Sequence, residues 1–253
     1  MKVLFAGPSL YGTEWVAERE HEVEGVLCRP PAAQGDITRA VLEGATVIGL
    51  IDGRYEDVAA VWHKEILFAL ESDVRVYGAA SMGALRAAEC APFGMIGIGA
   101  VFARYASGEL ADDAAVAQIH APTELGSVPL TEALVNVEAS IARFLELRAI
   151  SGDEALALCH AARRLFFKKR TWKEILSRAD LGSARCQRLG ELIRRCKVDV
   201  KREDALALAN YFAYVEPNRL EREDDWRFEV SPAWMRVLEH AQAYVGSAGS
   251  GAA

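Results

Sequence analysis

Four short apolar runs in the first third of the chain constrain the fold most. Each has the length of a β-strand, is rich in β-branched or aromatic residues, and ends in turn-forming residues. The runs cover residues 3–6, 23–27, 46–51 and 74–77. Between them lie segments typical of helices, at about residues 13–20, 35–43 and 57–71. This alternation predicts an α/β fold with a short, mostly parallel sheet that is covered by helices on both faces.

The predicted sheet places four loops along one edge. In an open parallel sheet the carboxyl ends of all strands lie at the same edge, and ligands usually bind there. The loops that follow the four runs begin at Gly7, Arg29, Asp52 and Gly78. We therefore expect the functional residues of this chain to lie in these loops.

Beyond about residue 125 the pattern changes from strands to helices. Apolar residues recur at helical spacing over residues 130–147 and 151–169. Further helical stretches lie near residues 171–178, 183–196, 202–214 and 231–244. We expect an α/β core over residues 1–125, which carries the functional edge, and an all-helical region over residues 126–245. Residues 246–253 contain only Gly, Ser and Ala, and we expect them to form a flexible tail.

Charge and composition exclude several classes of protein. The 29 Lys and Arg against 36 Asp and Glu give a formal net charge of −7, and no basic run is present, which argues against nucleic-acid binding. The chain has no signal sequence and no apolar stretch of the ~20 residues that a membrane span needs, so we expect a cytoplasmic protein without membrane contact. It has no phosphate-binding loop and no cluster of metal ligands, so we expect neither cofactor nor metal. The five cysteines, which are widely spaced and expected to be reduced, are Cys28, Cys90, Cys159, Cys186 and Cys196.

Residues 74–89 carry the most informative pattern, because a strand turns sharply through small residues into an Ala-rich helix. Ser81 lies at the bend, and Ala79-x-Ser81-x-Gly83 resembles a nucleophile elbow in which alanine replaces the first glycine. The backbone amides of Met82 and Gly83 would then bind a developing oxyanion. The alternative is structural, because serine is also among the best helix N-caps.

A nucleophilic serine needs a base, and residues 61–67 supply two candidates. His63 could act with Asp52 as its orienting carboxylate. Lys64 could act if apolar surroundings keep its amine neutral. The helical projection, however, places Glu65 near the middle of the apolar face and Lys64 at its side. A solvated Lys64 beside a buried, hydrogen-bonded Glu65 is therefore the structural alternative.

Residues 29–36 form an unusual loop at the same edge. Pro30 and Pro31 stiffen its start and could form a wall, while Gln34 and Asp36 offer polar groups to a bound chain end. Alternatively, Asp36 caps the following helix and Asp52-Gly53 is only a turn. Because several such loops converge on one edge, their joint occurrence favours a binding site.

Together, these motifs resemble those of the TfuA-like protein family. The resemblance extends to about residue 135, whereas the helical half is not diagnostic. It rests on residues 7–9, 30–36, 51–53, 61–67, 78–89, 92–95, 112–113, 122–126 and 129–130.

The resemblance implies a role in peptide backbone thioamidation. In this family a YcaO-type enzyme activates the peptide amide with ATP, and the TfuA-like protein supplies sulfur. The sulfur arrives as the C-terminal thiocarboxylate of a small ubiquitin-like carrier resembling ThiS, which the TfuA-like protein hydrolyses to release sulfide. The modified peptide is a further partner to consider.

The family's Ser–Lys pair matches Ser81 and Lys64 best, and Ser9 is a second serine at the same edge. The resemblance implies a hydrolase that uses this pair, with the carrier tail in a narrow slot. The residues expected to bind the tail are Pro30, Pro31, Gln34, Gly35, Asp36, Ala79 and Ala80. Two alternatives stay open. One is a non-catalytic adaptor that recruits the peptide to the YcaO-type enzyme, and the other is a general serine esterase or amidase. The latter is disfavoured because Asp52 and His63 precede Ser81 in the chain.

Overall fold

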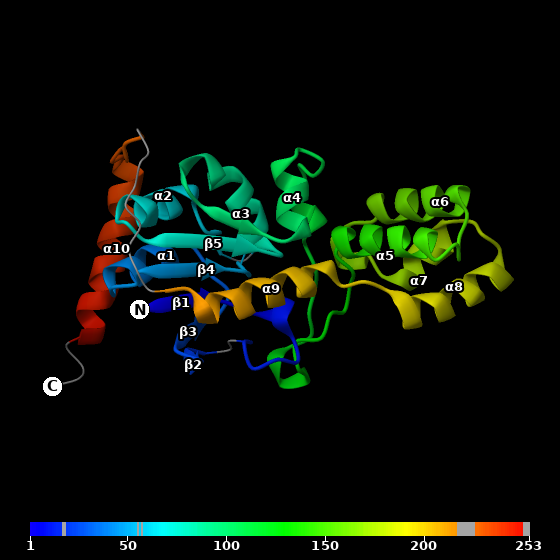
Figure 1. The fold of residues 1–253 in the computed structure, drawn as a ribbon, viewed down its shortest axis with the longest axis horizontal. Coiled ribbons are helices and arrows are strands. Elements are labelled where there is room, and N and C mark those ends of the chain that lie inside the picture. The colour runs from blue at the N-terminus through cyan, green and yellow to red at the C-terminus, as the bar shows by residue number, and fades with distance from the viewer. Residues whose placement is uncertain (17–18, 55, 57, 217–225, 250–253) are drawn as a thin grey trace.

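A six-stranded sheet forms the centre of the N-terminal part. The computed structural model describes residues 1–16, 19–54, 56, 58–216 and 226–249. The strands are β1 (Lys2–Phe5), β2 (His21–Val23), β3 (Val26–Arg29), β4 (Val47–Leu50), β5 (Arg75–Ala79) and β6 (Ile96–Ile98). Their order is β2-β3-β1-β4-β5-β6, and all pairs are parallel except β2 with β3. The predicted α/β class with a mostly parallel sheet and a helical C-terminal region is confirmed (Figure 1).

Four details differ from the predicted elements. The run at 23–27 is split by a turn at Glu24 and Gly25, both with positive φ, so it forms the hairpin of β2 and β3. Strand β6 was not predicted, because it has only three residues and a central glycine. The helix expected at 13–20 is absent from its described residues, which form turns, and the helix expected from residue 57 begins only at His63.

Successive side chains along each strand point to opposite faces of the sheet, so the core residues lie on two sides of it. Val3 and Phe5 face one side, which α1 (Asp36–Leu42), α2 (His63–Glu71) and α3 (Met82–Cys90) cover. Leu4 and Ala6 face the other side, where α9 (Val200–Tyr214) packs. α4 (Ala100–Ala106) lies beside α3 and α9. Both faces are therefore buried, as a parallel sheet requires.

Four helices form a separate cluster at one end of the molecule (Figure 1). They are α5 (Leu134–Glu146), α6 (Gly152–Arg163), α7 (Trp172–Arg178) and α8 (Ser183–Cys196), and they share their own apolar core. We call α5–α8 the helical lobe. Short 3-10 helices occur at η1 (Pro8–Leu10), η2 (Ala91–Phe93), η3 (Asp113–Ala115), η4 (Thr123–Leu125) and η5 (Phe167–Lys169).

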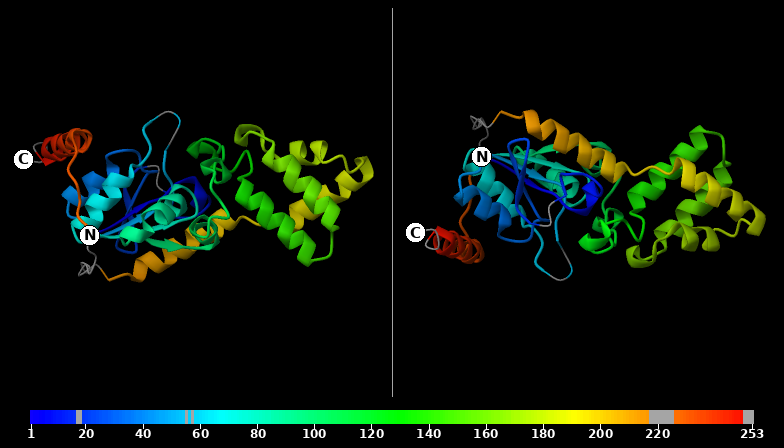
Figure 2. Two further views of the ribbon diagram at one scale, coloured as in Figure 1. Left: turned by 90° about the horizontal axis from the view of Figure 1, so that it is seen from above. Right: turned by 90° about the horizontal axis from the view of Figure 1, so that it is seen from below.

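The last two helices return from the helical lobe to the sheet. α9 runs along the sheet, and α10 (Pro232–Gly249) packs against α1 (Figure 2). The predicted division at residue 125 stays a prediction, because α9 and α10 follow the helical lobe in the chain yet pack with the α/β part. α10 includes residues 246–249 of the expected tail, and residues 250–253 lie outside the described residues. Within the described part of the chain, no helix is both long and apolar enough to cross a membrane.

Candidate active site

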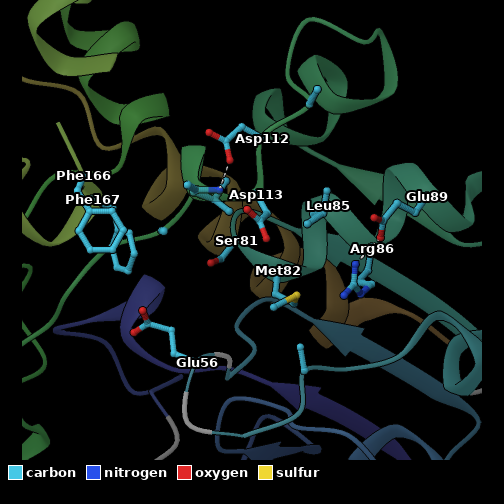
Figure 3. A pocket seen from close by; sticks show the side chains of 15 residues that line it. Glu56, Ser81, Met82, Leu85, Arg86, Glu89, Asp112, Asp113, Phe166 and Phe167 are labelled. Atoms are coloured by element: carbon cyan, nitrogen blue, oxygen red, sulfur yellow. Dashed lines mark hydrogen bonds and ion pairs between the residues drawn. The ribbon is translucent and has the colours of Figure 1, made fainter. Parts of the chain in front are cut away.

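A cavity of about 610 Å³ opens between α3, the loop around η3 and the start of η5. Its walls combine apolar and acidic side chains from the α/β part and the helical lobe (Figure 3). The lining residues are Glu56, Ala60, Ser81, Met82, Leu85, Arg86, Glu89, Ala111, Asp112, Asp113, Ala114, Val116, Ala117, Phe166 and Phe167. Ser81 is thus the one serine among these lining residues.

Ser81 lies at a strained bend between β5 and α3. Ala80 before it has a φ of 67°, a left-handed conformation that costs about 1 kcal/mol or more for a residue with a Cβ. The Ser81 N–H donates to the Ala79 carbonyl across this bend at 2.9 Å. Figure 3 shows the Ser81 hydroxyl turned toward the side of the cavity that holds Glu56 and Phe167.

Glycines allow α3 to approach the sheet closely below Ser81. A Cβ on Gly83 would lie 1.8 Å from the Leu50 carbonyl oxygen, and one on Gly78 would lie 2.2 Å from the Gly83 carbonyl oxygen. Both contacts are with backbone, which cannot move aside. The small residues around Ser81 therefore bring the start of α3 against the carboxyl ends of β4 and β5.

The first turn of α3 offers one backbone donor to the cavity. Ser81 occupies the N-cap position, as the structural alternative expects, but its side chain makes no capping hydrogen bond. The Gly83 N–H donates to the Ile51 carbonyl at 3.1 Å, which engages the second of the two predicted oxyanion donors. In the part of the chain that the structure describes, the Met82 N–H has no such partner.

Asp52 and Ser9 are hydrogen-bonded to each other and do not line the cavity. The two residues are 5% and 4% exposed. Ser9 Oγ donates to Asp52 Oδ1 at 2.6 Å, and the Gly7 and Ser9 N–H groups donate to Asp52 Oδ2 at 3.0 Å each. The Asp52 carboxylate thus holds the loop after β1 against the loop after β4.

The three predicted residues at the start of α2 lie outside the Ser81 cavity. The Lys64 ammonium stands 5.2 Å from the ring centre of Phe228. His63 pairs with Glu89 at 2.9 Å, and Glu89 is a lining residue of the cavity. The roles of Lys64 and His63 in catalysis stay predictions.

Glu65, by contrast, is a buried structural group. It accepts hydrogen bonds from the N–H groups of Gly35, Thr38 and Trp62. Burial raises the pKa of its carboxyl, while these hydrogen bonds lower it. The carboxylate therefore joins the loop before α1 to the start of α2.

The seven residues expected to bind a carrier tail are distributed over three places. Ala79 and Ala80 are fully buried. Gln34 and Gly35 line a second cavity, under α10, and Pro30, Pro31 and Asp36 line a third, near Arg29 and Tyr244. Asp36 is engaged there, because it accepts the Ala33 N–H at 2.8 Å and pairs with Arg39. The structure thus separates these residues from the Ser81 cavity, and their role in binding stays a prediction.

Lys201 is a buried lysine that the sequence interpretation missed. It is 3% exposed, and its Nζ donates to the Val116 carbonyl at 2.7 Å. Burial lowers its pKa, whereas the charges of Asp52 and Asp199 raise it. A signal was present in the sequence, because Lys201 lies four residues before Ala205 and seven before Leu208, on the apolar face of α9.

His120 lies close to this lysine. Burial and the nearby Lys201 charge lower the pKa of His120 to about 3. The imidazole is therefore neutral at ordinary pH. Ser9, Asp52, His120 and Lys201 are thus linked by a hydrogen bond and by their charges, and we call them the buried polar cluster.

Comparison with known families gives a match to part of the chain. Residues 52–171 match the model of the family described as TfuA-like protein. Over these residues the chain is similar to TfuA-like proteins. TfuA-like proteins are associated with a partner role in thioamidation, in systems that contain a YcaO-type enzyme. No curated protein matches the chain.

The TfuA-like match contains every lining residue of the Ser81 cavity. Ser9 precedes the matched segment and Lys201 follows it. Among the described residues of this TfuA-like chain, no group of three or more His, Cys, Asp and Glu could hold a metal ion.

Proposed function

We propose that this TfuA-like protein hydrolyses the C-terminal thiocarboxylate of a ubiquitin-like carrier resembling ThiS, and that a YcaO-type enzyme uses the sulfide. The observation that carries the proposal is the position of Ser81. Its hydroxyl faces a cavity at a strained strand-to-helix bend and makes no capping bond. Strain of this kind is typical of functional residues.

The Ser81 hydroxyl would attack the thiocarboxylate carbon and form a tetrahedral intermediate. The Oγ–H proton passes to a base and then to sulfur, the C–S bond breaks, and hydrosulfide leaves an acyl ester on Ser81. Water then cleaves the ester, which regenerates Ser81 and gives the carrier carboxylate and a proton. The Met82 N–H, at the positive end of α3, would stabilise the oxyanion.

The walls of the cavity suit an extended, uncharged chain end. Met82, Leu85, Val116 and Phe166 supply apolar surface on different sides of Ser81. Phe166 belongs to the helical lobe and is 59% exposed. A Gly-rich carrier tail would lie between the lobe and α3, with its thiocarboxylate at Ser81.

Sulfide release from a purified thiocarboxylated carrier tests the proposal. The wild-type protein alone should release sulfide and convert the carrier to its carboxylate, which mass spectrometry detects. Ser81→Ala should abolish release while carrier binding survives. Undiminished release by Ser81→Ala would remove Ser81 from the mechanism.

The adaptor alternative predicts a different result in the complete reaction. With a YcaO-type enzyme and its peptide but without this protein, added sulfide should restore thioamidation fully if the protein only supplies sulfur. An adaptor would show no hydrolysis of the carrier, and thioamidation with added sulfide would still require the wild-type protein surface.

A further inference from the structure

We propose that the end of the helical lobe next to the Ser81 cavity is the surface on which the sulfur carrier docks, and that it recognises an acidic face of that carrier. This inference rests on the proposed function for the identity of the partner. The surface consists of six exposed basic side chains, which we call the basic patch. They are Lys168, Lys169, Lys173, Arg194, Arg195 and Lys197.

Charge is distributed unevenly along the chain. Residues 163–197, from the end of α6 to the end of α8, contain 12 Lys and Arg against three Asp and Glu, which gives a formal charge of +9. Because the whole chain carries −7, the remaining residues carry −16. Positive charge is therefore concentrated in the helical lobe, and such an asymmetry directs a charged partner to one side of a protein.

The two halves of the basic patch meet at Glu132. The Glu132 N–H donates to the Arg170 carbonyl at 2.6 Å, and the Lys197 Nζ donates to the Glu132 carboxylate at 3.2 Å. Every other member of the patch lies within three residues of Arg170 or Lys197. The start of α7 and the end of α8 thus present their cations at one end of the lobe, the end that faces the α/β part (Figure 1).

Most cations of the basic patch have no acidic partner within the protein. Lys168 and Lys197 are ion-paired, with one glutamate each, at 2.9 Å and 3.2 Å. The other four members make no ion pair and no side-chain hydrogen bond with any residue that the structure describes. Their charges are therefore available to the carboxylates of a partner.

The basic patch adjoins the Ser81 cavity. Phe166 and Phe167, which line the cavity, directly precede Lys168 in the chain, and Figure 3 shows the Ser81 hydroxyl turned toward their side of it. Lys168 pairs with Glu56, another lining residue. A carrier bound to the patch would therefore have its flexible C-terminal tail beside the cavity that holds Ser81.

Phe166 adds an apolar contact to this surface. It is 59% exposed, and its ring centre lies 4.6 Å from that of Phe167. An aromatic side chain with polar and charged side chains around it is typical of protein interfaces, in which the aromatic residue supplies much of the binding energy. The surface thus combines an apolar contact with charges that select the partner.

The charges around the cavity also favour one orientation of an acidic partner. Glu89, Asp112 and Asp113 line the cavity from the α/β part. An acidic carrier face is repelled by these carboxylates and attracted by the patch, so it docks on the lobe. A nucleic acid is disfavoured, because a long polyanion would extend from the six cations onto the acidic remainder of the chain.

Binding of a ThiS-like carrier that ends in an ordinary carboxylate measures docking without catalysis. Lys169→Glu/Lys173→Glu should raise the Kd by about 10-fold or more at low salt, because it reverses two charges of the patch. Arg194→Glu/Arg195→Glu should have a similar effect from the other half of the patch. Isothermal titration calorimetry measures the Kd, and a thermal melt checks that each variant is folded.

Arg178→Glu/Arg188→Glu is the matched control. It changes the net charge by the same amount, through two exposed arginines of α7 and α8 that lie outside the patch. The control should change the Kd by less than about threefold, because charges distant from the contact are screened. Raising the salt from about 50 mM to about 500 mM should weaken binding to the wild-type protein, and this titration needs no variant.

Kinetics and a charge exchange separate docking from a general effect on the fold. In the sulfide-release assay the patch variants should raise KM and leave kcat unchanged, because the patch does not touch the reacting bond. Replacing exposed acidic residues of the carrier by lysine should weaken binding to the wild-type protein and restore part of the binding to the patch variants.

Three results would overturn the inference. One is an unchanged Kd in both patch variants, and another is an equal loss in the control variant. The third is loss of binding to the YcaO-type enzyme, its peptide or an oligonucleotide while carrier binding is retained. If the patch variants lose carrier binding but the wild-type protein releases no sulfide, the proposed function is wrong and the docking surface stands.

Discussion

Ser81 and Ser9 follow strands on either side of β4, yet their surroundings differ in every respect that matters for reactivity. Ser81 faces a cavity and makes no capping bond, whereas Ser9 is 4% exposed and donates to Asp52 at 2.6 Å. The first hydroxyl is available to a ligand, and the second is used to hold two loops together. Position at the carboxyl edge of a parallel sheet is therefore not enough to identify a nucleophile.

The difference arises from the backbone before each serine. Ala80 adopts a left-handed conformation that turns the chain sharply into α3 and presents Ser81 at the surface of the cavity. Ser9 lies within a short 3-10 helix after Gly7, and the Asp52 carboxylate binds the N–H groups of that turn. The backbone is thus strained before Ser81, whose hydroxyl faces the cavity, whereas Ser9 and its turn have their hydrogen bonds satisfied by Asp52.

The largest expected effect is on the rate of sulfide release, which should differ between variants of the two serines. Ser81→Ala should lower sulfide release by about 10³-fold or more, because it removes the nucleophile, and should leave the melting temperature nearly unchanged. A rate assay and a thermal melt on the same preparation measure both. Equal losses of rate in Ser81→Ala and Ser9→Ala would remove the distinction.

Gly83→Ala should destabilise the fold by about 4 kcal/mol, because its Cβ would overlap the Leu50 carbonyl oxygen. Gly152→Ala is the matched control, since Gly152 begins α6 and has nothing within 4 Å of an added Cβ; it should alter stability by less than about 1 kcal/mol. Urea unfolding compares the two. Similar midpoints would mean that α3 does not need its close approach to β4.

Ser9→Ala should lower the free energy of unfolding by about 2 kcal/mol, because it removes a buried hydrogen bond to a carboxylate. Ser81→Ala serves as its control in the same urea titration, since the Ser81 side chain makes no capping bond. A larger loss of stability in Ser81→Ala than in Ser9→Ala would contradict the assignment of Ser9 as the hydrogen-bonded serine and Ser81 as the serine that faces the cavity.

The buried polar cluster should also make stability depend on pH through His120. The pKa of His120 is lowered to about 3 in the folded protein, so between that value and about 6.5 the unfolded chain binds the extra proton. Stability should therefore fall as pH decreases through this range, by about 1 kcal/mol per pH unit. His120→Asn should lack this part of the slope between pH 5 and 7 in urea titrations. An unchanged slope would show that His120 is not held neutral.

The strand pattern and the Ser81 bend were predictable because both depend on local sequence. Periodicity marked the parallel strands, and small residues around Ser81 marked the turn into α3. Strand β6 was not predicted, because three residues around Gly97 are too few to show a pattern typical of a strand.

The surroundings of Lys64 and Lys201 could not be predicted in the same way, because they depend on which helix covers which face of the sheet. Lys64 is near Ser81 in the sequence, but its ammonium contacts the Phe228 ring. Lys201 is 120 residues after Ser81 and reaches the sheet only because α9 returns from the helical lobe. Its position on an apolar helical face was the available signal, but the sequence alone does not show that this face packs under β5.

Mapping the covalent intermediate tests the central claim most directly. The protein is mixed with excess thiocarboxylated carrier, quenched in acid within the first turnover, digested and examined by mass spectrometry. The account predicts a carrier-tail ester on the peptide that contains Ser81, with Ser9 unmodified. An acyl group on Ser9, on a cysteine or on any other residue, with Ser81 left free, would contradict it.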